Sequence, residues 1–226
     1  MHALQLPSRI APLRVLCIGA HSDDIEIGCG GTALSLLEAH PGSEAHWVVF
    51  SAAGARDAEA RQSAAAFLAD AGKRDVKIGP FRDGFFPFEG ARVKEYFEAL
   101  KHDLSPDLIF THRLEDRHQD HRLLAELTWN TFRDHVVLEY EIPKYEGDLG
   151  QANILVPLAE RVARRKLELL MSGFGSQRSK RWFNEETFAA LMRLRGMEAG
   201  IAGAWAEGFC ARKLLMNAGG RMRGDA

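Results

Sequence analysis

The chain has few cysteines, and none of them are closely spaced. Cys17, Cys29 and Cys210 are odd in number and lie far apart. A disulfide framework needs paired cysteines, and a thiolate zinc site usually contains a Cys-x-x-Cys pair, so the sequence argues against both. It indicates a protein of a reducing compartment.

Excess charge of one sign and long apolar runs are also missing. The formal net charge is −2, and so weak a field would not gather nucleic acid, so we expect no nucleic-acid partner. No apolar run approaches the ~20 residues that span a bilayer. The N-terminus lacks the basic and apolar regions of a signal peptide. We therefore expect a cytoplasmic protein without a transmembrane segment.

Strand-like and helix-like segments alternate through the first 140 residues. Apolar runs predict strands at 14–20, 45–50, 75–79, 107–112 and 136–140. Apolar residues at helical spacing predict helices at about 30–40, 56–71, 93–104 and 118–132. This alternation predicts an α/β class with a Rossmann-like layered fold, in which helices cover both faces of a mostly parallel sheet.

The length of 226 residues favours a single domain with a sizeable core. We expect one domain over 1–226, with its core at about 14–142. The remaining 143–226 are expected to form a C-terminal helical cap, with helices near 157–172 and 185–200.

Two polar stretches combine imidazole and carboxylate groups. His21-Ser22-Asp23-Asp24 directly follows the first strand, and His118-Gln119-Asp120-His121 comes shortly after the strand at 107–112. Ligand sites in open parallel sheets form at the carboxyl ends of the strands, and a Rossmann-like order makes the first and fourth strands neighbours. Two histidines and one carboxylate suit a catalytic zinc, because they leave a position open for water. The sequence therefore predicts the site of a metal hydrolase.

Local spacing suggests how these residues divide the work. Asp116 before the predicted helix and Gln119 three residues later resemble a capping box. His118 and His121 would then share one helical face. The adjacent Asp23 and Asp24 project in different directions, so one would ligate the metal and the other would act as a general base on water.

The glycines of Gly28-Cys29-Gly30-Gly31-Thr32-Ala33 suggest a different class of protein, a non-catalytic Rossmann-like module that binds a nucleotide. The run fits a loose Gly-x-Gly-x-x-Ala form, but it begins well after the strand end at Ala20. Ser51 stands near the end of the second strand, where an acidic residue is expected. A nucleotide cofactor is thus disfavoured, and we interpret the glycines as letting a helix pack closely behind the metal loop.

The first polar stretch and these glycines together resemble a known family. Residues Ala20 to Thr32 are similar to the Ala-His-Pro-Asp-Asp-Glu…Gly-x-Gly-Gly signature of the PIG-L/LmbE-like deacetylases, and His118 to His121 match that family's His-x-Asp-His motif. Ser22 replaces the usual Pro, and Ile25 stands where Glu often follows the aspartates. Weaker similarities extend the likeness over about 14–178, at Arg82-Asp83-Gly84, Thr111-His112, Lys166 and Ser176-Gln177.

The resemblance implies zinc-dependent hydrolysis of an N-acetyl group, usually on a glucosamine unit. By position, His21, Asp24 and His121 would bind Zn²⁺. Asp23 would be the base, His118 would stabilise the oxyanion or protonate the leaving amine, and Asp120 would orient His118. The expected partner is a small-molecule or glycolipid amino sugar. A related zinc amidase that cleaves another acyl group or a thiol conjugate is the alternative.

Several further residues could contact a substrate. Phe85, Phe86 and Phe88 share one loop, where they could stack on a sugar or simply pack, and the pattern favours neither. Arg56 or Arg61 could hold a substrate hydroxyl or phosphate, although such arginines more often belong to solvated helix faces.

Overall fold

A seven-stranded sheet forms the centre of the computed structural model, which describes residues 12–201, 203 and 205–215. The strands lie in the order β3-β2-β1-β4-β5-β7-β6. They are β1 (Arg14–Gly19), β2 (Glu44–Val49), β3 (Lys73–Ile78), β4 (Leu108–His112), β5 (Val136–Tyr140), β6 (Ile154–Leu158) and β7 (Trp205–Cys210). The first five are parallel, and β7 is antiparallel to β5 and β6. The predicted α/β class with a mostly parallel sheet is confirmed, and β1 lies beside β4 as predicted.

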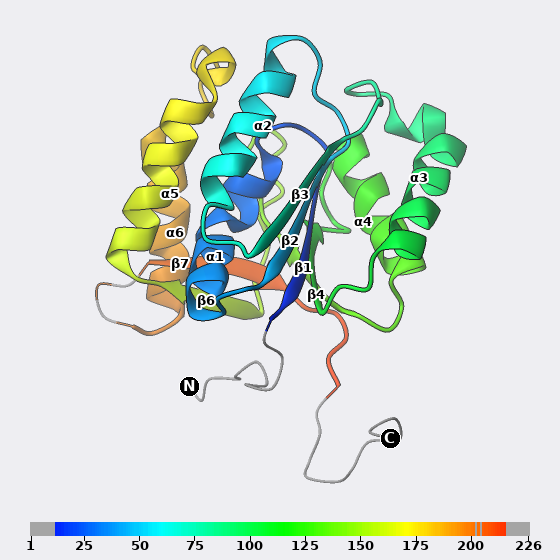
Figure 1. The fold of residues 1–226 in the computed structure, drawn as a ribbon. Helices are drawn as coiled ribbons and strands as arrows, with labels where there is room; N and C mark the ends of the chain where they lie inside the picture. The colour runs from blue at the N-terminus through cyan, green and yellow to red at the C-terminus, as the bar shows by residue number, and fades with distance from the viewer. Residues whose placement is uncertain (1–11, 202, 204, 216–226) are drawn as a thin grey trace, which may run out of the picture.

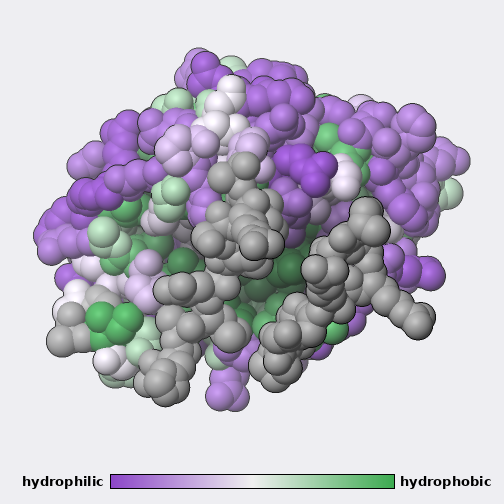
Figure 2. Space-filling view, turned by 60° about the horizontal axis from the view of Figure 1, so that its bottom comes forward, coloured by the Kyte–Doolittle hydropathy of each residue, from purple (hydrophilic) through white to green (hydrophobic). Residues whose placement is uncertain are grey.

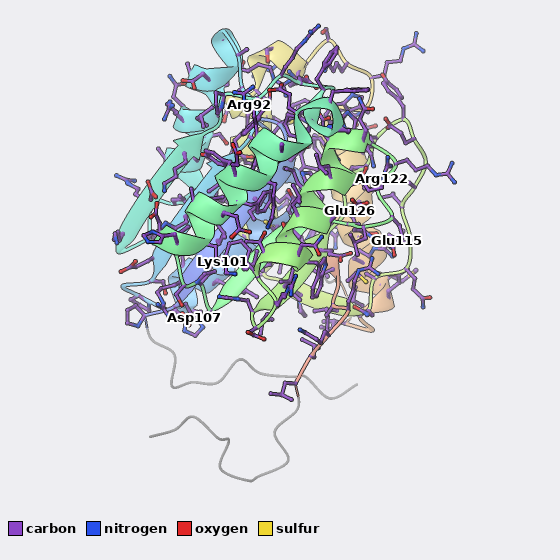
Figure 3. The ribbon with its side chains drawn as sticks, turned by 90° about the vertical axis from the view of Figure 1, so that its right-hand side faces the viewer. Arg92, Lys101, Asp107, Glu115, Arg122 and Glu126 are labelled. Atoms are coloured by element: carbon purple, nitrogen blue, oxygen red, sulfur yellow. The ribbon has the colours of Figure 1, made fainter. Side chains whose placement is uncertain are left out.

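Helices cover both faces of this sheet (Figure 1). One layer contains α1 (Asp24–Ala39), α2 (Ala55–Phe67), α5 (Glu160–Gly173) and α6 (Glu185–Glu198). The other contains α3 (Gly90–Asp103) and α4 (Gln119–Thr131). Short 3₁₀ turns, η1 (Phe86–Glu89) and η2 (Gly175–Gln177), precede α3 and follow α5. Figure 3 looks onto the second layer, where Arg92 and Lys101 mark α3 and Arg122 and Glu126 mark α4.

Each layer of helices encloses its own hydrophobic core. Val15 and Cys17 of β1 pack with Phe67 of α2 in the core on one face. Leu16 and Ile18 belong to the core on the other face. Successive side chains of a strand point to opposite faces, so a strand buried on both faces is a continuous apolar run. This is why the strand could be identified from the sequence.

The first helix begins earlier than the sequence predicts. The predicted start is near Gly30, but α1 begins at Asp24, so the glycines lie inside the helix. A Cβ on Gly28 would be 2.1 Å from the Tyr140 ring, and one on Gly30 would be 2.6 Å from the Phe67 ring. The predicted close packing of the helix is therefore confirmed. The boundary was wrong because tertiary packing outweighs the low helix propensity of glycine.

The C-terminal part contributes strands as well as the predicted helices. α5 and α6 form, but β6 and β7 also continue the sheet, and the sequence analysis did not predict them. Glu207 and Gly208 interrupt the apolar pattern of β7, yet Glu207 is buried because it pairs with Lys166 at 2.6 Å. A charged strand residue whose partner lies on a distant helix cannot be recognised by periodicity.

The parallel strands run upward in Figure 1, so their carboxyl ends lie at the top. Figure 2 shows the opposite end, where hydrophilic side chains cover the outer helices and hydrophobic ones gather nearer the centre. Within the described part of the chain, no helix is both long and apolar enough to cross a membrane.

Candidate active site

The carboxyl ends of β1 and β4 bring the two polar stretches together. β1 pairs directly with β4, and each strand leads into one of the stretches. The side chains of His21, Asp23, Asp24, Asp120 and His121 are buried, and His118 is partly exposed. All the predicted site residues therefore lie in one region of the molecule.

Three candidate ligand atoms form a nearly equilateral triangle. Nδ1 of His21 lies 3.3 Å from Oδ2 of Asp24 and 3.2 Å from Nε2 of His121, and the latter two atoms are 3.4 Å apart. Tetrahedral zinc with bonds of about 2.0–2.2 Å places its ligand atoms ~3.3 Å from one another. The predicted ligands thus fit a zinc ion.

A second carboxylate holds each of these histidines from behind. Nε2 of His21 is 3.2 Å from Oδ2 of Asp120, and Nδ1 of His121 is 3.0 Å from Oδ2 of Asp116. Metal-bound histidines commonly donate their other N–H to a carboxylate, which fixes the ring and its tautomer. This arrangement leaves Nδ1 of His21 and Nε2 of His121 on the side where a metal ion would bind.

The role predicted for Asp120 needs correction. Its carboxylate contacts His21 and also accepts hydrogen bonds from the backbone N–H groups of Gly84 (2.6 Å) and Phe86 (3.1 Å). Its contact with His118 runs through the backbone, because the Asp120 N–H donates to Nδ1 of His118 at 3.3 Å. The Asp120 carboxylate therefore orients His21 and the loop at 84–86, whereas the ring of His118 is contacted by the Asp120 backbone N–H and not by the carboxylate.

The predicted capping box is also wrong. α4 begins at Gln119, and its N-cap is His118. The Gln119 side chain donates to the carbonyl oxygen of Gly84. Asp116 accepts the His118 N–H at 2.8 Å through one oxygen, while the other meets His121 and Nζ of Lys144, the latter at 3.0 Å. Sequence reasoning missed Lys144, because a lone lysine in a long loop carries no pattern.

Asp23 has one engaged oxygen and one free oxygen. Oδ1 accepts from Nη2 of Arg56 at 3.1 Å, whereas the buried Oδ2 has no hydrogen-bond partner among residues 12–201, 203 and 205–215. Burial, helped by the negative charge of Asp24, raises the pKa of Asp23 to about 6, although Arg56 opposes the shift. Such a carboxylate is suited to accept a proton near neutral pH.

The histidines differ in their charge. Burial and the neighbouring His112 lower the pKa of His121 to about 4, and burial with the nearby His21 lowers the pKa of His118. Burial would lower the pKa of His21 too, but Asp24 and Asp120 outweigh it and raise that pKa well above its ordinary value. The rings of His118 and His121 are therefore neutral at pH 7.

His112, at the end of β4, supports the site from below. Its ring stacks on His121 with centroids 3.9 Å apart, and its Nε2 lies 3.3 Å from Oδ2 of Asp24. That nitrogen accepts the Ala20 N–H at 3.0 Å. Asp24, His112 and His121 are close enough to hold an ion, but the His112 lone pair is already engaged. The only sequence signal for His112 was the weak family similarity at Thr111-His112.

The two candidate arginines have different surroundings. Arg56 reaches the site, where Nε donates to Oγ of Ser22 at 2.8 Å and Nη1 lies 3.5 Å from Oδ2 of Asp83. Asp83 is half-exposed, and its Oδ1 is 3.0 Å from Nε2 of His21. Arg61 instead pairs with Asp57 at 2.9 Å on an exposed helix face. The expectation that such arginines lie on solvated helix faces is thus correct for Arg61 and wrong for Arg56.

The three phenylalanines of the loop also differ in their exposure to solvent. Phe86 is fully buried, and its ring centroid lies 6.1 Å from that of His21. Phe85 and Phe88 are exposed, and Arg82 stacks on Phe85 with its Cζ 3.7 Å from the ring centroid. One ring supports the site and two lie at the surface.

A surface groove of about 580 Å³ lies elsewhere, between α1, α2 and α5. Leu37, Asp70 and Arg161 are among its lining residues. Leu37 is near the end of α1 farthest from Asp24, and the lining contains none of the predicted site residues. The groove is therefore separate from the cluster of histidines and aspartates that forms the candidate active site.

Comparisons with known proteins agree with this arrangement. A family model described as PIG-L, GlcNAc-PI de-N-acetylase, matches residues 16–132. The conserved protein TT1542 from Thermus thermophilus shares the fold with a TM-score of 0.71 at 19% identity, covering 93% of this chain and 100% of that one. An N,N'-diacetylchitobiose deacetylase from Pyrococcus horikoshii gives 0.68 at 20%, covering 92% and 86%.

A third similar structure carries a different activity. The 4-carboxy-2-hydroxymuconate hydratase from Pseudomonas putida gives a TM-score of 0.65 at 18% identity, covering 92% of this chain and 100% of that one. Because one fold supports different reactions, these structural similarities show the fold alone. The family model, however, spans more than half of the chain and contains both polar motifs. On that match, this chain belongs to the PIG-L family.

Proposed function

We propose that this protein is a zinc-dependent N-deacetylase that hydrolyses the acetamide of an N-acetylated amino sugar of the N-acetylglucosamine type. The observation that carries the proposal is the triangle of His21, Asp24 and His121, with atoms 3.2–3.4 Å apart, next in the chain to Asp23, whose Oδ2 has no hydrogen-bond partner among the described residues. Membership of the PIG-L family and similarity to a diacetylchitobiose deacetylase support this substrate class.

The donor set and its charge suit a divalent cation. Three protein ligands leave a coordination position open, as in other catalytic zinc sites. Asp23, Asp24 and Asp83 lie close to one another beside Arg56 and the His21 ring, and the raised pKa of His21 shows that the carboxylates favour positive charge here, so a divalent cation in place of that proton would relieve their repulsion. When bound, zinc would supply a Lewis acid that polarises the amide carbonyl and makes water more acidic.

Asp23 is the proposed general base. Its carboxylate takes a proton from water as the water oxygen forms a bond to the carbonyl carbon. The same proton then passes to the sugar nitrogen as the C–N bond breaks, which releases acetate and a free amine. The pKa of about 6 suits both steps, because the group is mostly ionised at neutral pH but holds a proton readily.

His118 is the proposed donor to the developing oxyanion. Its Nδ1 accepts the Asp120 N–H, so the proton of the neutral ring lies on Nε2 and can be donated. This favours the oxyanion role over protonation of the amine. One such donor contributes about 2.7–4 kcal/mol to transition-state stabilisation.

Arg56 and Asp83 are the proposed contacts to the sugar. They come from α2 and from the loop after β3, and both lie at the partly exposed side of the site. A guanidinium and a carboxylate together can donate to and accept from hydroxyl groups. We therefore assign the sugar ring to this side and its acetamide to the metal.

The test of this function is a panel of acylated amines with parallel elemental analysis. We expect about one zinc per chain and equal amounts of acetate and amine from N-acetylglucosamine or N,N'-diacetylchitobiose. Hydrolysis confined to longer acyl groups or thiol conjugates would favour the related amidase instead. A protein that lacks zinc and hydrolyses none of the panel would be a binding module.

Two histidine variants separate metal binding from catalysis. His121→Ala should lose both zinc and activity, because it removes a ligand. His118→Ala should keep zinc while kcat falls about 10²- to 10³-fold, because only the oxyanion donor is lost. Arg61→Ala, on the exposed face of α2, is the control and should match the parent protein. Loss of zinc from His118→Ala would make His118 a ligand and overturn its assigned role.

A further inference from the structure

Ser22 is a fully buried hydroxyl in the middle of the first polar stretch. It follows His21, a candidate ligand, and precedes Asp23, the proposed base. The family signature usually has proline at this position, and proline has no side-chain oxygen. A hydroxyl that is removed from water needs a hydrogen-bond partner within the protein. The partner of Ser22 therefore indicates what this chain gains from having serine here.

That partner is the guanidinium of Arg56. Its Nε donates to Oγ of Ser22 at 2.8 Å, and its Nη2 donates to Oδ1 of Asp23 at 3.1 Å. Its Nη1 lies 3.5 Å from Oδ2 of Asp83. Each of the three nitrogens of one planar group thus has an oxygen partner. These contacts fix both the position and the plane of the guanidinium.

The contact with Ser22 is the shortest of the three. Arg56 is the second residue of α2, so its long side chain reaches across to the loops that follow β1 and β3. An arginine side chain loses much rotamer freedom when it is held in one geometry. The contact with Asp83 is near the upper limit for a hydrogen bond, and that carboxylate is 56% exposed. The guanidinium is therefore anchored mainly by the two buried residues, Ser22 and Asp23.

Asp23 is oriented by the same contact. Its Oδ1 is engaged by Arg56, whereas the buried Oδ2 has no hydrogen-bond partner among residues 12–201, 203 and 205–215. A carboxylate with one oxygen held in place presents the other oxygen in a defined direction. A general base needs such a defined direction, because proton transfer requires hydrogen-bond geometry.

We propose that Ser22 is a positioning residue for the deacetylation reaction. By holding Nε of Arg56, it keeps Oδ1 of Asp23 bound and leaves Oδ2 to take the proton of water. This inference rests on the proposed function, in which Asp23 is the base. It is compatible with the sugar contact assigned to Arg56, because a guanidinium has five N–H donors and only three of them are engaged here.

The test begins with substitutions that remove the hydroxyl. Acetate release from N-acetylglucosamine or N,N'-diacetylchitobiose is measured together with zinc content. Ser22→Ala should keep its zinc and lose about tenfold in kcat, as expected for a lost hydrogen bond to a charged group. Ser22→Cys keeps the size of the side chain but is a weak acceptor, so its kcat should fall in the same direction. Ser22→Thr keeps the hydroxyl and should retain most of the parental kcat.

A double-mutant cycle separates positioning from a merely structural role. Arg56→Met removes the residue through which Ser22 is proposed to act, so adding Ser22→Ala to it should not lower kcat further. The Nε–H resonance of Arg56, identified by its absence from Arg56→Met, provides a readout that is independent of activity. This proton should exchange with water faster in Ser22→Ala than in the parent protein, because its acceptor is lost.

Ser43→Ala is the matched control. Ser43 is also buried, and its Oγ accepts the Leu13 N–H at 3.1 Å and donates to the His40 carbonyl at 2.6 Å. It directly precedes β2, at the opposite end of the parallel strands from the site, so its loss should leave kcat unchanged.

Three outcomes would overturn the role of Ser22 while the parent protein still releases acetate. They are an unchanged kcat in both Ser22→Ala and Ser22→Cys, an equal loss of kcat with and without Arg56, and a rise in KM alone. The last would mean that Ser22 orients Arg56 for the sugar and not for the base. A parent protein that releases no acetate would overturn the proposed function itself.

Discussion

Asp23 and Asp24 are chemically identical neighbours with opposite surroundings. Oδ2 of Asp24 accepts the backbone N–H of His21 at 2.7 Å and faces the rings of His112 and His121. Although burial would raise the pKa of Asp24, the three histidines lower it well below its usual range. Asp23 has a raised pKa and one oxygen that accepts no hydrogen bond from the described residues. Environments that separate the pKa values of two carboxyl groups suit them to different roles, here the proposed ligand and the proposed base.

Substitution of each aspartate by asparagine should separate these roles. Asp23→Asn keeps the shape of the side chain but cannot take a proton, so kcat should fall about 10²- to 10⁴-fold while zinc is retained. KM should stay within a fewfold. Asp24→Asn should lose zinc first and activity as a consequence. Elemental analysis and steady-state kinetics on both variants decide the matter, and the reverse pattern would exchange the two assignments.

Glu26, also near the site, should make the stability of the protein depend on pH. Neither of its buried oxygens has a hydrogen-bond partner in the part of the chain that the structure describes. Burial raises the pKa of Glu26 to about 8, and the nearby Ser63 hydroxyl opposes this only in part. The folded protein therefore keeps a proton that the unfolded chain releases near pH 4.5. The free energy of unfolding should fall as pH rises from 4.5 to 8, by up to about 1.4 kcal/mol per pH unit from this group.

Glu26→Gln removes that proton exchange, so its unfolding free energy should depend less on pH than that of the parent protein. Urea denaturation of the metal-free proteins at pH 5, 6, 7 and 8 measures the difference. Glu168→Gln, on an exposed face of α5, is the matched control and should keep the parental slope. An unchanged slope in Glu26→Gln would show that Glu26 is not protonated in the folded state.

At the scale of the element, α1 depends on the absence of a side chain at Gly28. An added Cβ would lie 2.1 Å from the Tyr140 ring, and that ring is held because its hydroxyl donates to the Ile18 carbonyl at 2.6 Å. Gly28→Ala should therefore lower the free energy of unfolding by about 1–3 kcal/mol.

Gly90→Ala, in α3, is the matched control for Gly28→Ala. Gly90 has helical angles at the start of α3 (φ −51°, ψ −39°), and a Cβ there would meet nothing within 4 Å. Alanine at such a position should be neutral or stabilise the protein by up to about 1 kcal/mol. Urea denaturation checks both variants. Equal effects would mean that the close approach of α1 to Tyr140 is not what requires glycine.

At the scale of the whole molecule, a buried ion pair joins the C-terminal part to the helix that carries Asp24. Lys166 of α5 lies 2.6 Å from Oε1 of Glu207 in β7 and donates to the Ile27 carbonyl at 2.6 Å. Glu207 in turn accepts the N–H groups of Gly31 (2.8 Å) and Thr32 (2.6 Å). The two strands that periodicity did not predict are therefore coupled to the site through α1.

Lys166→Met should destabilise the protein by about 3–5 kcal/mol, because it leaves the buried Glu207 carboxylate without its cation. Arg161→Met is the control on the same helix. It removes a pair of similar length, 2.5 Å, whose side chains are largely exposed, so the loss should be about 1 kcal/mol or less. Comparable losses in urea denaturation would contradict a special role for the buried pair.

The sequence by itself determined the parallel core and the two polar motifs at its edge. A strand such as β1, buried on both faces, is a continuous apolar run, and the residues after its end stand next to it in the chain. His21, Asp24 and His121 could therefore be placed together from local patterns and strand order. Their roles as ligands, and the rest of the mechanism, remain proposals.

Only the tertiary structure decided what surrounds those residues. The Asp120 side chain contacts His21, which is 99 positions away in the sequence. Arg56 contacts Asp23 at a separation of 33 positions, and Lys144 contacts Asp116 at a separation of 28. Likewise, β7 was not predicted, because the buried charge of Glu207 is neutralised by Lys166, 41 positions away in the sequence. The physical reason is the same in each case. Burying a charge is favourable only beside its partner, and when that partner comes from another element, no periodicity in the sequence can identify it.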